Sequence, residues 1–297
     1  MYAQFFGSYL LNREAVSPED LTAAITLLAD THIKLGTLAM HMGYMTASEV
    51  DEVCFLQTRE DKKFGEIALR RNYLFESQLD ELLKAQIPDY LLLGQTLVDM
   101  GCLTNSDLEE LMVSYQSECQ LSEEGDGYET QSITTKLLTN FFKQSGAEIS
   151  EYAIMYMNLI FNNLIRFIGE DFTPLTPVFC EEYDTNCCVR QSISGAINCI
   201  SRIDMSEDVA LAFASRYAKM EFADYDEYVE ASLEDFLNLH NGLYSVNMSN
   251  LYSEELTLEP PVREEAPTLA LEEGSFVIPV IYPFGTVYLL LSMKEAD

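Results

Sequence analysis

The sequence predicts an α+β protein with two domains: an all-α N-terminal domain of four 29-residue repeats, and a two-layer α+β domain with a mostly antiparallel sheet. Glycines recur at this interval through the N-terminal part, and each is followed by the start signals of a helix. The C-terminal part interleaves helical patterns with short alternating runs typical of strands. The 297 residues are about two average domains, and 48% hydrophobic residues allow each to bury a core.

The charge and cysteine content exclude several classes of function. The net charge is −32 and both halves are acidic, so nucleic acid and anionic membrane surfaces would be repelled. The longest apolar stretch, residues 152–168, is interrupted by polar side chains and is not a membrane span. The N-terminus lacks a basic segment before an apolar one, and the seven cysteines match no zinc or haem spacing. We expect a soluble cytoplasmic protein with reduced thiols, no nucleic-acid partner and no membrane partner.

The repeats begin with helix signals at fixed offsets from each glycine. Ten and thirteen residues after the glycine, three of the four repeats carry a hydroxyl residue and an acid, which is the pattern of a capped helix N-terminus. The residue seven after the glycine is twice glycine and once asparagine, as expected where a short helix ends. One unit cannot bury its own apolar stripe, so the four should pack together over residues 1–118. The repeat glycines are Gly7, Gly36, Gly65 and Gly94, and the three caps are Ser17/Asp20, Thr46/Glu49 and Thr104/Asp107.

These motifs resemble the N-terminal domain of type II secretion and pilus ATPases, the GspE/MshE N-terminal family. The resemblance covers roughly residues 1–118 and rests on Lys34-Leu35-Gly36, Gly43-Tyr44-Met45-Thr46, Gln57, Phe64-Gly65, Tyr73-Leu74 and Gln86. Some members bind cyclic di-GMP through motifs that begin Arg-Leu-Gly. Here Phe5, Lys34, Lys63 and Leu92 stand where that arginine would be, and lysine lacks the planar fork that stacks on guanine. The resemblance therefore favours a docking or scaffold module, with a cyclic di-GMP sensor as the alternative and no nucleotide-binding residues assigned.

Residues 119–134 are acidic, contain glycine and serine, and are expected to form a linker before a domain at 135–297. In that domain, residues 137–168 read as helix with a break at Gly146, and Ser206 begins a helix expected to extend to Met220. A long helix is expected over residues 224–249. The expected strands are an edge strand within 171–183, two strands within 187–203, one at 255–258, and a terminal hairpin of 276–282 and 286–293.

The long helix has two faces of different character. One is apolar and is expected to face the core; its members are Val229, Leu233, Phe236, His240, Leu243 and Tyr244. The other carries one carboxylate and one carboxamide, three residues apart, between two small residues. Small residues at this place would let another protein approach closely. This second face, the Asp–Asn seam, consists of Ala231, Asp235, Asn238 and Gly242.

The seam resembles the motif of CheC and CheX phosphatases of chemotaxis, in which Glu-x-x-Asn is followed by 22 residues and a proline. Here Asp235-Phe236-Leu237-Asn238 is followed by residues 239–260 and Pro261. The resemblance covers roughly residues 148–297. CheC carries two such motifs and CheX one, so this chain with its single motif is CheX-like.

The resemblance implies two-component signalling, with dephosphorylation of a phosphorylated CheY-like receiver. Asn238 would orient the attacking water, and Asp235 would grip the receiver beside Ala231 and Gly242. The receiver already holds Mg²⁺, so no cofactor or metal of the chain's own is expected. Asp235 replaces the family's glutamate and is one methylene shorter, which keeps a docking protein without catalysis as an alternative. A homodimer is compatible with CheX-like relatives, and the cognate receiver is left open.

Overall fold

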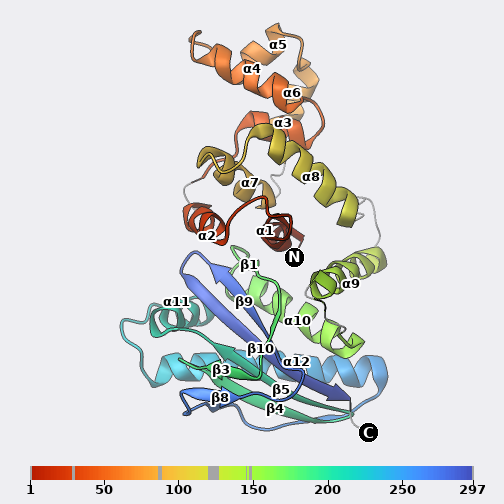
Figure 1. Cartoon of the computed structure of the whole chain (residues 1–297), viewed down its shortest axis with the longest axis vertical. Coiled ribbons are helices and arrows are strands. Elements are labelled where there is room, and N and C mark those ends of the chain that lie inside the picture. The colour runs from red at the N-terminus through yellow and green to blue at the C-terminus, as the bar shows by residue number, and fades with distance from the viewer. Residues whose placement is uncertain are drawn as a thin grey trace. The chain divides into compact units, whose positions relative to one another are not determined.

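The computed structural model describes residues 2–28, 31–85, 89–119, 127–144, 146 and 149–295. The chain divides into two compact units, Tyr2–Gly125 and Asp126–Asp297. Within the described ranges, the regular elements of the first are all helices, and the second combines helices with an antiparallel sheet (Figure 1). The α+β fold class predicted from the sequence is confirmed. No helix within these described ranges combines the length and the apolar character needed to cross a membrane.

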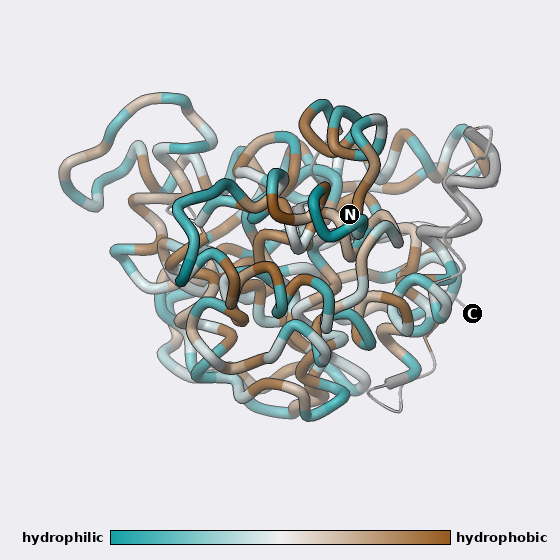
Figure 2. The backbone as a smooth tube through the Cα atoms, turned by 90° about the horizontal axis from the view of Figure 1, so that it is seen from above, coloured by the Kyte–Doolittle hydropathy of each residue, from teal (hydrophilic) through white to brown (hydrophobic). Residues whose placement is uncertain are grey.

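The N-terminal unit consists of four helical pairs with the predicted repeat. Each pair has a first helix that carries the repeat glycine and a second that carries the apolar stripe. Hydrophobic and hydrophilic residues alternate along the backbone, as expected of helices with one buried face (Figure 2). The pairs are α1 (Tyr2–Asn12) with α2 (Pro18–Leu27), α3 (Leu35–His41) with α4 (Ala47–Gln57), α5 (Phe64–Arg70) with α6 (Glu76–Leu82), and α7 (Asp89–Asp99) with α8 (Asn105–Cys119).

The predicted helix starts and turns are present. The Thr46 hydroxyl accepts from the Glu49 backbone amide at 3.4 Å, and the Glu49 carboxylate accepts from the Thr46 amide at 2.8 Å, which is the reciprocal capping box. The Ser17 and Thr104 hydroxyls accept in the same way from the amides of residues 20 and 107, each at 3.1 Å. All four residues at the turn position have positive φ. They are Glu14 (54°), Gly43 (68°), Asn72 (62°) and Gly101 (78°), so Glu14 adopts the left-handed conformation without being glycine or asparagine.

The repeat glycines mark close contacts between the two helices of a pair. A Cβ atom added at Gly94 would lie 2.6 Å from Leu108 Cδ1, and one added at Gly36 would lie 2.7 Å from Val50 Cγ1. In both repeats the contacted residue is the first of the apolar stripe, 14 positions after the glycine. The 29-residue period therefore records a helix crossing with no room for a side chain.

The repeats do not stack in sequence order. Helix α7 of the fourth repeat contacts α1 and α2, and α7 and α8 also contact α3. Helix α3 in turn contacts α5 and α6. The spatial order is therefore first, fourth, second, third, with the fourth repeat between the first two (Figure 1). Lys34 stands where the GspE/MshE motif has its arginine. In this arrangement it forms an ion pair with Asp99 of the fourth repeat, with Nζ and Oδ1 2.5 Å apart.

The C-terminal unit contains four helices among its described residues: α9 (Gly127–Gln144), α10 (Glu151–Phe167), α11 (Glu207–Ala218) and α12 (Glu227–Tyr252). Helix α9 begins inside the segment expected to be a linker, so residues 127–134 correct that expectation; residues 120–126 lie outside the described residues. The expected break lies at Gly146, whose φ is 74°. The sequence of the whole helix, residues 127–144, is amphipathic, and this outweighs the polar composition of its first turns.

The large sheet has the order β1-β9-β10-β5-β4-β6, and every pair in it is antiparallel. Short β2 joins β9, short β7 joins β4, and β3 pairs with β8 in a separate ribbon. Helix α12 packs on β4, β5 and β6 and is flanked by α10 and α11. The strands are β1 (Thr173–Pro174), β2 (Val178–Phe179), β3 (Glu182–Asp184), β4 (Val189–Gly195), β5 (Ile197–Asp204), β6 (Leu256–Leu258), β7 (Val262–Arg263), β8 (Thr268–Ala270), β9 (Phe276–Tyr282) and β10 (Gly285–Glu295).

Two details of the predicted helices are wrong. Helix α11 ends at Ala218 with left-handed Lys219, so Met220 lies beyond it and is 57% exposed instead of lining the core. Leu243 of α12 is 38% exposed, whereas Leu237 and Asn241 are buried. The other five predicted core residues of α12 are buried, so the buried face keeps the predicted stripe and is wider on one side, where hydrogen-bonded partners allow Asn241 to be buried.

Candidate functional site

The Asp–Asn seam lies on the solvent side of α12. Ala231, Asp235 and Asn238 are exposed and Gly242 is half-buried, while the opposite face of the helix is fully buried. Residues three and four apart stack along one side of a helix, so the seam is one continuous strip. The buried core holds this strip on a rigid element, which is where a binding or catalytic group is positioned best.

The side chain of Asn238 is held by Gln191 of β4. The Gln191 amide nitrogen donates to Asn238 Oδ1 at 2.8 Å and to the backbone carbonyl of Glu259, also at 2.8 Å. Gln191 is 1% exposed, so this donor reaches the surface residue from inside the fold. Asn238 keeps its two amide hydrogens and the second lone pair of Oδ1 for groups outside the chain.

Gln191 belongs to a buried polar chain that continues to α10. Its Oε1 accepts from the Asn241 amide at 2.8 Å, and that amide also donates to the Ser201 hydroxyl at 3.0 Å. The Tyr156 hydroxyl donates to Asn241 Oδ1 at 2.8 Å. Burial raises the pKa of Tyr156 well above its usual value, so this hydroxyl stays a donor. Each of these side chains is satisfied by its neighbours, which makes their burial tolerable.

The distance in sequence between Asn238 and Pro261 has a geometric origin. From Asn238 the helix runs 14 residues to Tyr252, a length of about 21 Å. Ser253 is left-handed (φ 59°) and turns the chain, and β6 returns antiparallel to β4. From Ser253 the extended chain covers about 20 Å in the six residues to Glu259, whose carbonyl meets Gln191 beside Asn238. The helix and the return strand cover nearly equal lengths in opposite directions. The segment that leads to Pro261 therefore returns to the level of Asn238.

Asp235 is oriented by a different neighbour. The Tyr217 hydroxyl of α11 donates to Asp235 Oδ2 at 2.6 Å. Burial and this hydrogen bond raise the pKa of Tyr217, so the hydroxyl stays protonated and remains a donor. The carboxylate is thereby drawn toward α11, and Oδ1 remains for a partner.

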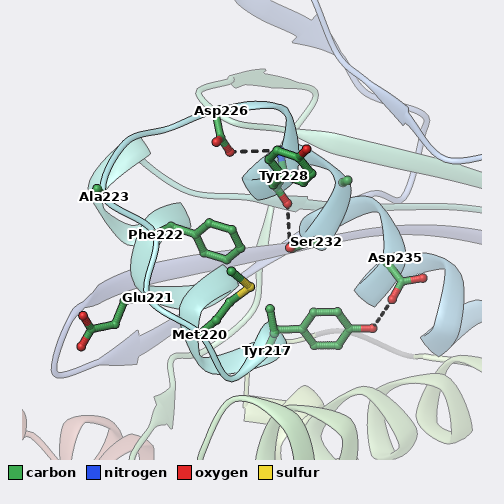
Figure 3. Close-up of a pocket in the computed structure, with 11 residues that line it drawn as sticks. Tyr217, Met220, Glu221, Phe222, Ala223, Asp226, Tyr228, Ser232 and Asp235 are labelled. Carbon is green, nitrogen blue, oxygen red and sulfur yellow. Dashed lines mark hydrogen bonds between the residues drawn. The ribbon is translucent and has the colours of Figure 1, made fainter.

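A groove adjoins Asp235 between the end of α11 and the first half of α12. Its volume is about 670 Å³. Figure 3 shows Met220 and Phe222 on one side and Tyr228 on the other, with the Tyr217–Asp235 pair at one end. Met220 and Tyr228 are 57% and 65% exposed. A partner that reaches Asp235 therefore also meets an apolar surface.

The residues described here contain no group of three or more histidine, cysteine, aspartate or glutamate side chains arranged to hold a metal ion. His240, on the core side of α12, is fully buried, and burial lowers its pKa to about 3. It cannot exchange protons with a substrate on the seam, because its ring lies on the opposite side of the helix against Tyr156.

Sequence reasoning placed the Asp–Asn seam and missed the two residues that orient it. Gln191 is 47 positions before Asn238, and Tyr217 is 18 before Asp235. The only signal for Gln191 is its place at an inward position of a strand, where a polar residue interrupts buried neighbours. Tyr217 carries no signal, because a tyrosine near the end of a helix is common.

No protein-family model matches the sequence, and no curated protein matches it. Solved structures of CheX- and CheC-like chemotaxis proteins are similar to the C-terminal half. CheX from Desulfovibrio desulfuricans is 14% identical with a TM-score of 0.42, over 49% of this chain and 100% of that one. CheX from Vibrio vulnificus gives the same four values. CheX from Borrelia burgdorferi, in a complex with CheY, BeF3 and Mg²⁺, is 16% identical with a TM-score of 0.39, over 49% of this chain and 99% of that one.

Proposed function

We propose that the C-terminal unit dephosphorylates a phosphorylated CheY-like receiver domain. In this proposal Asn238 orients the attacking water and Asp235 binds the receiver. The observation that carries it is the seam itself, where an exposed carboxamide and an exposed carboxylate share one face of a rigid helix. Ala231 and Gly242 flank them and let a second protein approach closely.

The chemistry requires little from this chain. A phosphorylated receiver already holds its acyl phosphate and a Mg²⁺ ion, and hydrolysis needs a water molecule in line with the phosphorus–oxygen bond that breaks. Asn238 accepts a hydrogen bond from that water through the free lone pair of Oδ1, and its amide hydrogens can hold the water's oxygen. The oxygen of the water bonds to phosphorus, the bond to the aspartyl oxygen breaks, and inorganic phosphate leaves. Because Asn238 holds the water in place beforehand, the entropy cost of orienting it is not added to the barrier.

The test is the decay rate of a phosphorylated CheY-like receiver with and without the full chain. We expect faster decay with the wild-type chain. We expect the Asn238→Ala variant to lose the acceleration and still bind the receiver, because the substitution removes the amide and leaves Asp235 in place. Acceleration that survives Asn238→Ala would refute the assignment of Asn238.

One observation favours a second function, docking without hydrolysis. Asp235 is shorter than the glutamate of the resembling motif, and its Oδ2 is bound to Tyr217. Both features shorten the reach of the carboxylate, so a receiver held by Asp235 would be placed less accurately on Asn238, and hydrolysis would suffer before binding does. Absence of acceleration across several receivers, together with measurable binding lost on Asp235→Ala, would establish this alternative.

A further inference from the structure

We infer that Gln191 is a positioning residue for Asn238, and that it fixes which end of the Asn238 carboxamide faces the phosphorylated partner. This inference rests on the proposed function for its effect on rate, but its structural part does not. It adds to the surface seam a buried residue on the sheet, 47 positions away in sequence.

The orientation of Gln191 is forced by its neighbours. The carbonyl of Glu259 can only accept a hydrogen bond, so the nitrogen end of Gln191 must face it. The oxygen end then faces Asn241, whose amide donates to it. Asn241 cannot turn over, because its oxygen would then face Gln191 Oε1, which only accepts; in the observed orientation that oxygen accepts from the Tyr156 hydroxyl. Donors and acceptors therefore alternate in one direction from α10 to the surface.

Asn238 is the last member of this chain and receives its direction. Both amide hydrogens of Gln191 are used, one on the Glu259 carbonyl and one on Asn238 Oδ1. If Asn238 turned over, its nitrogen would face a donor, so the oxygen stays against Gln191 and the amide hydrogens stay outward. Donation from Gln191 also polarises the Asn238 amide, which strengthens its remaining hydrogen bonds.

Burial makes this hold rigid. Gln191 is 1% exposed, and Asn241 is fully buried. Four buried polar groups that satisfy one another are costly to maintain unless all of them stay paired. Apolar residues would hold α12 on the sheet equally well, but they could not orient Asn238. We therefore assign that role to the network.

The experiment compares Gln191→Met with a matched control, Gln95→Met. Methionine keeps the length of glutamine and loses its hydrogen bonds. Gln95 is also 1% exposed and accepts from the Thr37 hydroxyl at 2.5 Å, but it lies in the N-terminal unit. Saturation kinetics with phosphorylated receiver give kcat and KM for the wild-type chain and both variants. We expect Gln191→Met to lower kcat about 10-fold to 10²-fold with KM unchanged, because displacing a catalytic group by about 1 Å has an effect of this size. Gln95→Met should leave both constants unchanged.

A second measurement does not depend on catalysis. The side-chain amide signal of Asn238 is identified in an NMR spectrum by its loss in Asn238→Ala. We expect its order parameter to fall below about 0.6 in Gln191→Met and to stay at the wild-type value in Gln95→Met. An unchanged order parameter, or an unchanged kcat while Asn238→Ala abolishes turnover, would overturn the inference. If wild-type protein hydrolyses no receiver, the proposed function fails, and the order parameter alone still decides whether Gln191 positions Asn238.

Discussion

We expect the buried His240 to make the protein less stable in mild acid. A single substitution of this residue should remove the effect. The ring is fully buried, stacks edge-on against Tyr156 with centroids 4.4 Å apart, and has one nitrogen, Nδ1, 3.1 Å from the Asn163 amide. The other nitrogen, Nε2, is buried without a hydrogen-bond partner. Nothing around the ring stabilises a second proton, so burial lowers the pKa from 6.5 to about 3.

The sign follows from proton binding in the two states. Below pH 6.5 the unfolded chain binds a proton at His240 that the folded chain excludes, so stability falls as the pH falls. Between pH 8 and pH 4.5 this amounts to roughly 2–3 kcal/mol, since each pH unit below 6.5 costs about 1.4 kcal/mol until the folded pKa is approached. The contribution is fully present above pH 6.5 and continues to fall toward pH 3.

The assay is urea denaturation followed by circular dichroism at several pH values, for the wild-type chain and His240→Phe. Phenylalanine keeps the aromatic contact with Tyr156 and cannot titrate. We expect the free energy of unfolding of the wild-type chain to fall by about 2–3 kcal/mol more than that of the variant between pH 8 and pH 4.5. His32→Gln, which removes an exposed imidazole, controls for the loss of a histidine as such. Parallel pH profiles, or an NMR titration of His240 with a midpoint near 6, would refute the role assigned to burial.

Three substitutions test other parts of the structure. Gly94→Ala forces a methyl group against Leu108, so we expect about 1–3 kcal/mol of destabilisation in thermal unfolding, and an unchanged melting temperature would contradict the close helix crossing. Gly242→Ala meets nothing within 4 Å and should stabilise α12 by about 0.5–1 kcal/mol, while raising KM for the receiver because the methyl group stands on the seam. Asp235→Glu gains about 1.5 Å of reach and no longer meets Tyr217 in the same way, so KM for the receiver should fall by about 10-fold, the effect of one better hydrogen bond to a charged group; a higher KM would show that the seam is built for aspartate.

Local features of this chain were predictable from its sequence because local chemistry decides them. The capped starts of α4 and α8 and the left-handed residue after the first helix of each repeat depend on side chains within a few positions. Glu14 followed the repeat although its residue type argued against it. The backbone amides of Glu14 and Ala15 close the end of the helix on Leu11 and Leu10, as the turn requires, so the period of the pattern was a better guide than the single residue.

Long-range arrangement was not predictable. The four apolar stripes are alike, so nothing in the pattern says that the fourth repeat packs between the first and second. The resemblance of residues 1–118 to the GspE/MshE N-terminal family therefore stays a prediction, as does cyclic di-GMP binding. Lys34 forms an ion pair with Asp99 of another repeat. A nucleotide that contacts Lys34 must therefore compete with that carboxylate.

The candidate site combines both kinds of information. Spacing along α12 placed Asp235 and Asn238 on one face, since helix geometry alone determines which residues stack. What each amide or carboxylate atom faces is decided by Gln191 and Tyr217, which come from the sheet and from α11. The two differ in effect: Gln191 holds Asn238 from beneath and leaves its hydrogens outward, whereas Tyr217 draws the Asp235 carboxylate sideways. Hydrolysis requires that Gln191 hold Asn238 in place. Tight binding of the receiver requires that Asp235 be released from Tyr217. The kcat of Gln191→Met therefore reports the positioning of water, and the KM of Asp235→Glu reports the binding of the partner.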